Sequence, residues 1–185
     1  MLTVWERLLL RGKSREILLR RIRNPPAIVY ADAMMTPDLE LPMAGALLAL
    51  PCGIVEYFAC NVPHDVVQQF LVSAATCIAR AECWAQAASL ATWKELIRNN
   101  STIAFCDSTA ALGALIHGSS KAGDLNDIAG FVWDLACNWG LVLWWEWVPS
   151  HLNVADPISR GNFDMANLLG GRRVAPAATN ISFLR

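Results

Sequence analysis

Four acidic residues of this chain lie beside apolar segments that would hold their backbone in place. Asp32 and Asp107 each follow a short apolar run. Glu82 lies near the start of an alanine-rich run, and Asp156 directly precedes Pro157. Carboxylates that converge repel one another unless cations neutralise them, and Mg²⁺ prefers oxygen ligands while keeping waters and substrate phosphates as its others. If the four side chains meet, they would form a divalent metal site of the kind that acts on a phosphodiester.

Each of these residues, taken alone, also has an ordinary structural explanation. An aspartate at a strand end commonly caps a turn or a helix, and a lone glutamate on a helix is usually solvated. The metal site therefore depends on whether the strands and helices bring the four carboxylates together.

The apolar runs and turn residues predict an α/β fold. Strands are expected at residues 27–31, 43–50, 54–60, 102–106 and 141–148, and helices at 66–73, 77–98, 109–117, 124–139 and from 156 onward. Ser108 suits an N-cap and Gly140 a C-cap. Three strands followed by alternating helices and strands predict a mixed sheet with helices on its faces.

The expected elements place the acidic residues at one edge of that sheet. Asp32 ends the first expected strand and Asp107 ends the fourth. Adjacent strand ends bring their side chains together, and ligands commonly bind in the crevices there. Glu82 falls in the first or second turn of the long alanine-rich helix, whose small side chains would let it lie close to the sheet. Asp156 begins the last helix.

Several segments resemble the motifs of ribonuclease H domains, in the same order along the chain. The closing segment W-V-P-S-H-L-N-V-A-D-P-I-S-R, residues 147–160, resembles the V-P-x-x-x-N-x-A-D-x-x-S-R pattern of retroelement ribonuclease H domains. Residues 44–51 and 57–63 resemble the second and third strands of those domains, so the resemblance covers about residues 27–163. The other matching segments are I-V-Y-A-D-A at 28–33, R-A-E-C-W-A at 80–85 and A-F-C-D-S at 104–108.

The resemblance implies a ribonuclease H-like fold, with a mixed five-stranded sheet and helices on both faces. It also implies cleavage of the RNA strand of RNA/DNA hybrids with two Mg²⁺ ions, for which Mn²⁺ can substitute. His151 occupies the place of a mobile histidine that assists proton transfer or product release. The metal ligands carried over by position are Asp32, Glu82, Asp107 and Asp156.

The resemblance further implies that the chain is part of a retroelement reverse transcriptase polyprotein. Its expected partners are an RNA/DNA hybrid and an adjoining reverse transcriptase polymerase domain. We expect a basic N-terminal helix and linker at residues 1–26, the ribonuclease H-like domain at 27–170 and a C-terminal tail at 171–185. Asn153 and Arg160 are expected to support local structure or to contact phosphate.

The chain departs from the family pattern in two places. No glycine follows Asp32 until Gly45, which predicts a longer turn into the second strand. The basic helix with which some free-standing members grip the hybrid has no counterpart, since residues 118–123 contain only one basic residue, Lys121.

The net charge of −1 is distributed unevenly. Residues 1–23 carry +5, residues 24–171 carry −9 and the last residues carry +3. Nucleic-acid-binding domains are usually basic, so this acidic body argues against simple binding. It fits carboxylates that converge on cations.

Two alternative functions stay open. One is a catalytically inactive ribonuclease H-like module with a structural or nucleic-acid-binding role, although such a module has little reason to keep mutually repelling carboxylates. The other is a 3′–5′ exonuclease or a transposase-like enzyme of the same architecture. Asp38-Leu39-Glu40 has the D-x-E spacing that exonucleases use, but no apolar strand leads into it.

The cysteines, the tryptophans and the N-terminal residues give no indication of a structural zinc site or of secretion. The six cysteines form no C-x-x-C pair, which argues against a structural zinc site, and we interpret them as small buried hydrophobes in a reducing compartment. Trp144, Trp145 and Trp147 are expected in a strand buried on both faces rather than in a base-stacking platform. There is no secretory signal and no run of about 18 apolar residues, so we expect an intracellular protein, cytoplasmic or nuclear, without membrane contact.

Overall fold

Six strands form one mixed sheet in the computed structural model, which describes residues 25–36, 40–73 and 77–177. Their order across the sheet is β5-β4-β1-β2-β3-β6. β1, β2 and β3 are antiparallel neighbours, whereas β4 runs parallel to β1 and β5 parallel to β4. The strands are β1 (Ala27–Met34), β2 (Met43–Ala49), β3 (Val55–Asn61), β4 (Ser101–Cys106), β5 (Val142–Trp147) and β6 (Arg172–Arg173).

The sixth strand is the difference from the five-stranded sheet that we expected. β6 consists of two arginines that pair in parallel with Glu56 and Tyr57 of β3. Two charged residues carry no apolar alternation, so no sequence pattern marks them as a strand. Arg172 is fixed there by an ion pair with the buried Glu56, and residues expected in the C-terminal tail thus lie against the sheet.

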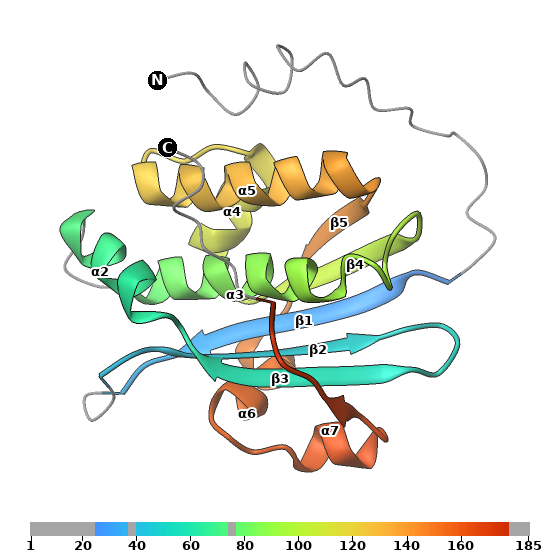
Figure 1. Ribbon diagram of the computed structural model, residues 1–185. Coiled ribbons are helices and arrows are strands. Elements are labelled where there is room, and N and C mark those ends of the chain that lie inside the picture. Colours follow the sequence, from blue (N-terminus) through green and yellow to red (C-terminus); the bar gives the residue numbers. More distant parts are fainter. Residues whose placement is uncertain (1–24, 37–39, 74–76, 178–185) are drawn as a thin grey trace.

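Helices cover both faces of the sheet, as expected (Figure 1). The larger core lies on the face covered by α3, α4 and α5, whereas α6 and α7 cover the opposite face. A second, smaller core forms there around Leu47, Tyr57, Ile158 and Ala166. The helices are α2 (His64–Ser73), α3 (Ile78–Trp93), α4 (Thr109–His117), α5 (Gly123–Trp139), the 3-10 helix η1 (Ser150–Leu152), α6 (Ala155–Ser159) and α7 (Asp164–Leu168).

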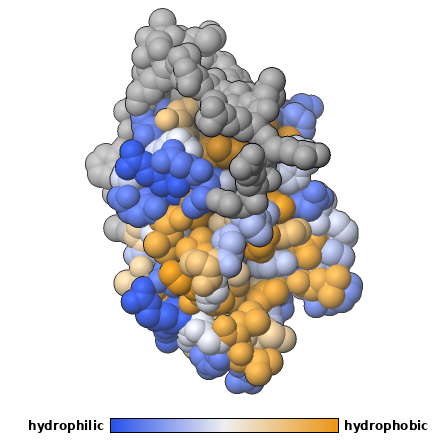
Figure 2. Space-filling model, turned by 90° about the vertical axis from the view of Figure 1, so that its right-hand side faces the viewer, coloured by the Kyte–Doolittle hydropathy of each residue, from blue (hydrophilic) through white to orange (hydrophobic). Residues whose placement is uncertain are grey.

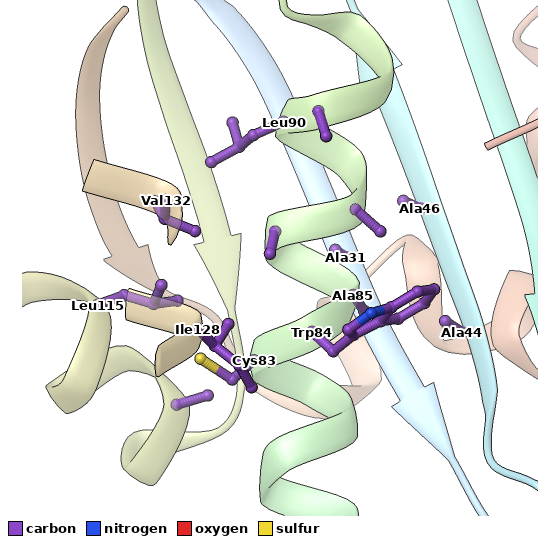
Figure 3. Close-up of a cluster of buried hydrophobic side chains, with 14 of the residues drawn as sticks. Ala31, Ala44, Ala46, Cys83, Trp84, Ala85, Leu90, Leu115, Ile128 and Val132 are labelled. Atoms are coloured by element: carbon purple, nitrogen blue, oxygen red, sulfur yellow. The ribbon is translucent and has the colours of Figure 1, made fainter. Parts of the chain in front are cut away.

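The alanine-rich helix α3 lies directly on the sheet, as its composition predicted. Ala81, Ala85 and Ala88 are fully buried. Figure 3 shows Ala85 and Trp84 of α3 beside the small side chains of the central strands, with α4 and α5 contributing larger apolar side chains on the other side of the helix. Small residues on both surfaces allow this close approach, and it sets the position of Glu82 on the same helix.

Local capping residues fix the helix ends largely as predicted. Ser108 accepts a hydrogen bond from the amide of Ala111 and begins α4, which has the expected bounds. Gly140 ends α5 in the left-handed conformation at φ 64°. Helix α3 ends at Trp93, five residues before the expected residue 98, because the following residues form turns that reach a left-handed Asn99.

The prediction of a last strand buried on both faces is wrong. β5 lies at the edge of the sheet, and Trp144 and Trp147 are 66% and 49% exposed, whereas Trp145 is buried. An edge strand pairs on one side only, and nothing among the described residues covers its outer side chains. A run of bulky apolar residues therefore did not indicate burial here.

The cysteine interpretation holds for part of the set. Cys77, Cys83 and Cys106 are buried, Cys60 and Cys137 are half-buried, and Cys52 is exposed on the turn between β2 and β3. Within the described residues, no helix combines the length and the apolar character that a membrane crossing requires. The basic N-terminal helix and linker expected at residues 1–26 lie outside the described residues, apart from the last two positions.

Helix α7 leaves apolar side chains on the surface. It contributes Ala166 to the second core, while Met165, Leu168 and Leu169 at its exposed side remain accessible. Figure 2 shows hydrophobic surface at the lower end of the molecule, where Figure 1 places this helix.

Candidate metal centre

Three of the four predicted carboxylates meet at one point. Asp32, Glu82 and Asp107 each offer one oxygen atom, and these three atoms lie within 4.8 Å of one another. The residues come from β1, from the second turn of α3 and from the position directly after β4. The convergence that the sequence predicted for these three residues is therefore present in the structure.

The parallel pairing of β1 and β4 brings the two aspartates together. Tyr30 is the register partner of Phe105, and Asp32 and Asp107 each lie two residues further along their chains. Side chains two residues apart in a strand point to the same face. The rings of Tyr30 and Phe105 stack with centroids 4.7 Å apart, so an apolar pair lies beside the aspartates on that face.

Asp32 does not end its strand, contrary to the prediction. β1 continues through Met34, because β2 pairs with it along its whole length up to Met34 opposite Met43. Asp32 therefore lies inside a hydrogen-bonded strand and is only 4% exposed. The longer turn expected after it falls partly on residues 37–39, which lie outside the described residues.

Burial shifts the titration of two of the carboxyl groups. The pKa of Asp32 is raised to about 6, chiefly because the group is removed from water. The hydrogen bond from Ser159 and the charge of Arg160 oppose this rise, whereas the charges of Asp107 and Asp156 contribute to it. Burial also raises the pKa of Glu82 to about 7, with Asp107 and Asp32 acting in the same direction and a hydrogen bond from Ser108 opposing them. For both groups burial is the largest cause of the shift, and it favours the protonated form of the carboxyl group.

The site fits a hard divalent cation. Oδ1 of Asp107 is buried and has no hydrogen-bond partner among the described residues. An unpartnered buried oxygen is costly, and a cation between the three carboxylates would satisfy it. Oxygen-only ligands of this kind suit Mg²⁺ or Mn²⁺.

Asp156, the fourth predicted ligand, lies beside this cluster but is held by another partner. It is in the first turn of α6, and its charge raises the pKa of Asp32. Arg160 forms a forked ion pair with it, with Nη2 2.9 Å from Oδ1 and Nε 3.1 Å from both carboxylate oxygens. The structure therefore places Asp156 near the three-carboxylate cluster but not in it.

Two further residues of the closing segment have distinct environments. His151 is exposed on η1, five residues before Asp156. Asn153 is buried, and its Nδ2 donates to the main-chain oxygen of Ala31 at 3.4 Å while its Oδ1 accepts from the amide of Ala155 at 3.1 Å. Asn153 thus supports local structure, as expected, and joins the start of α6 to β1.

Sequence reasoning missed three residues that support the site. Gln86, one turn after Glu82, donates from Nε2 to the main-chain oxygens of Ala31 and Phe105 and so ties α3 to both central strands. Ser159 contacts Asp32, and Gly45 lies opposite Asp32 on β2. Two signals in the sequence could have pointed to these residues. Gln86 follows Glu82 by one helical turn, and Ser159 is the serine of the closing motif. Gly45 had none, because its role depends on pairing between strands.

The D-x-E alternative receives no support from the described residues. Asp38 and Leu39 lie outside them, and Glu40 is exposed on a bend before β2.

Comparison with known proteins identifies the fold. No protein-family model and no curated protein matches the chain. Among solved structures, an N-terminal RNase H domain from Mycobacterium tuberculosis, determined as a fusion with maltose-binding protein, is 18% identical and has a TM-score of 0.53. That alignment covers 78% of this chain and 97% of the other.

Two RNase H1 structures are also similar to this chain. The protein from the halophilic archaeon Halobacterium salinarum is 17% identical, with a TM-score of 0.53 over 76% of this chain and 98% of its own. LC11-RNase H1, solved in complex with an RNA/DNA hybrid, is 13% identical, with a TM-score of 0.50 over 76% of this chain and 99% of its own. At these identities the likeness shows the fold, which is ribonuclease H-like, as the motifs predicted.

Proposed function

We propose that this chain is a metal-dependent endonuclease that hydrolyses the RNA strand of RNA/DNA hybrids. The observation that carries the proposal is the meeting of the Asp32, Glu82 and Asp107 oxygens within 4.8 Å, in a ribonuclease H-like fold. The hybrid is named as the substrate because the closing motif resembles retroelement ribonuclease H domains and because one neighbour in fold was solved with such a hybrid.

The carboxylates of Asp32, Glu82, Asp107 and Asp156 would hold two Mg²⁺ ions, or Mn²⁺ in their place. Two such ions, when bound, activate a water and stabilise the leaving oxygen in phosphodiester hydrolysis. The meeting of the Asp32, Glu82 and Asp107 oxygens supports this proposal, whereas Asp156 would have to exchange the guanidinium of Arg160 for a cation. Arg160, released from this pair, could then contact a phosphate.

His151 would move a proton or help product leave. Its side chain is exposed and lies in the segment that leads into Asp156. An exposed imidazole next to a phosphodiester can accept or donate a proton during turnover.

The basic residues that bind the hybrid would lie outside the acidic segment of residues 24–171. Residues 24–171 carry −9, which repels a polyanion. Residues 1–23, with +5, are one source of attraction. The other is an adjoining polymerase domain, if the chain belongs to a retroelement reverse transcriptase polyprotein.

Strand-specific cleavage tests the proposal. The full chain is incubated with an RNA/DNA hybrid labelled on either strand, with Mg²⁺ or with EDTA, beside Asp107→Asn. We expect the RNA strand alone to be cut, only with Mg²⁺ and only by the wild-type protein. Cleavage that persists in Asp107→Asn, or equal cleavage of both strands, would contradict it. An inactive wild-type protein that still binds hybrid would point to the non-catalytic module.

A further inference from the structure

The segment that carries Asp156 is attached to β1 at two points on either side of that residue. Before α6, Asn153 donates to the main-chain oxygen of Ala31. At the end of α6, Oγ of Ser159 lies 2.5 Å from Oδ2 of Asp32. Both residues are buried, as is Asp32 itself. Two consecutive residues of β1, Ala31 and Asp32, are therefore held by the two ends of the segment from Asn153 to Ser159.

A glycine allows α6 to come this close. Gly45 is the register partner of Asp32 in β2, and directly opposite residues point to the same face of the sheet. A Cβ atom at Gly45 would lie 2.3 Å from the amide nitrogen of Ser159 and 2.8 Å from its Cα. These are backbone atoms that cannot rotate away, so the backbone of α6 rests on the position where any other residue would carry a side chain.

The hydroxyl of Ser159 has one proton and two acceptors within reach. Oδ2 of Asp32 lies at 2.5 Å and the main-chain oxygen of Asp156 at 2.9 Å. Hydrogen bonds from a hydroxyl to a carboxylate are about 2.5–2.7 Å long and about twice as strong as bonds between neutral groups. An ionised Asp32 therefore takes the proton of Ser159 in preference to the peptide oxygen.

We propose that Ser159 is a positioning residue of the metal centre, which fixes the carboxylate of Asp32 in the orientation that binds a divalent cation. The hydrogen bond stops rotation of the carboxylate about its Cβ–Cγ bond and so directs its remaining lone pairs. The same helix turn carries Asp156, so this contact links cation binding at Asp32 to the placement of Asp156, which the bond from Asn153 to Ala31 also supports. This inference rests on the proposed function, since it assigns a role within the same site.

The expected loss without this hydroxyl is in metal affinity. Residues that orient metal ligands through hydrogen bonds change metal affinity by about 10–100-fold when they are replaced. Because Ser159 does not itself bind the metal, its removal should weaken the site and not abolish it.

Calorimetric titration of the full chain with Mn²⁺ alone tests this role. Ser159→Ala removes the hydroxyl, and Ser159→Thr keeps it. Ser89→Ala is the matched control, because Ser89 is equally buried and its hydroxyl donates to the main-chain oxygen of Gln86 within α3. Melting in EDTA, recorded for every variant, measures any general loss of stability.

We expect Ser159→Ala to bind Mn²⁺ at least tenfold more weakly than the wild type, while Ser89→Ala binds as the wild type does and Ser159→Thr recovers part of the loss. Unchanged affinity in Ser159→Ala, or an equal loss in Ser89→Ala, would overturn the inference and leave the proposed function standing. A wild-type protein that binds no Mn²⁺ would overturn both.

Discussion

Replacing Asp32 with asparagine is expected to stabilise the protein in the absence of divalent metal. Asp32 is buried beside Glu82 and Asp107, and burial raises its pKa from 3.8 to about 6. A carboxyl group whose pKa is raised on folding keeps its proton to higher pH in the folded state than in the unfolded state. Stability is therefore highest below about pH 4 and is lost as the pH rises through about 6. The asparagine side chain has the shape of the neutral acid and cannot ionise.

The size of the effect follows from the pKa of Asp32. A rise from 3.8 to about 6, at about 1.36 kcal/mol per pKa unit, is on the order of 3 kcal/mol at pH 8. That value already includes the favourable hydrogen bond from Ser159, which lowers the pKa. For a chain of this length, 1 kcal/mol corresponds to about 2–4 °C, so the melting temperature should rise by about 6–12 °C.

The assay is thermal melting of the wild type and Asp32→Asn in EDTA, at several pH values between 4 and 8. Glu95→Gln, an exposed residue in the turns after α3, is the control for loss of one negative charge. The advantage of Asp32→Asn should be largest at pH 8 and shrink toward pH 4, and added Mg²⁺ should stabilise the wild type more than the variant. An asparagine variant that is no more stable at pH 8, or whose advantage does not depend on pH, would refute the argument.

Three further perturbations follow from the same geometry. Arg160→Gln should release Asp156 and therefore tighten the weaker of two Mn²⁺ binding events in calorimetry; weaker binding would show that the arginine helps to form the site. His151→Ala should lower turnover on an RNA/DNA hybrid while Mn²⁺ affinity stays unchanged. A normal rate would show that His151 is a surface residue without a role in turnover. Gly45→Ala should lower the free energy of unfolding in urea by about 1–3 kcal/mol or more, because its Cβ meets the amide of Ser159; an unaffected midpoint would mean that α6 shifts freely.

Features set by local sequence could be predicted closely. The bounds of α4 follow from Ser108 and its hydrogen bond to the next turn, and the end of α5 follows from the conformational freedom of Gly140. The convergence of Asp32, Glu82 and Asp107 was also predictable, because it depends on the order of apolar strands and one long helix.

Features that depend on distant contacts were not predictable in this way. Ser159 meets Asp32 across 127 positions of sequence. Arg160 engages Asp156 through a helical i,i+4 pair, and the sequence alone does not say whether the carboxylate faces that arginine or a cation. The exposure of Trp144 depends on which elements cover its face of the edge strand β5, since Trp145 on the opposite face of the same strand is buried.

The position of bound metal decides whether Asp32, Glu82 and Asp107 form a metal site. Crystals of the full chain grown or soaked with Mn²⁺ would reveal the ion by its anomalous scattering, with Asp107→Asn crystals as the comparison. We expect a peak at ligand distance from Asp32, Glu82 and Asp107 in the wild type, and its loss or marked weakening in the variant. Manganese bound elsewhere on the protein, with this cluster vacant, would contradict it.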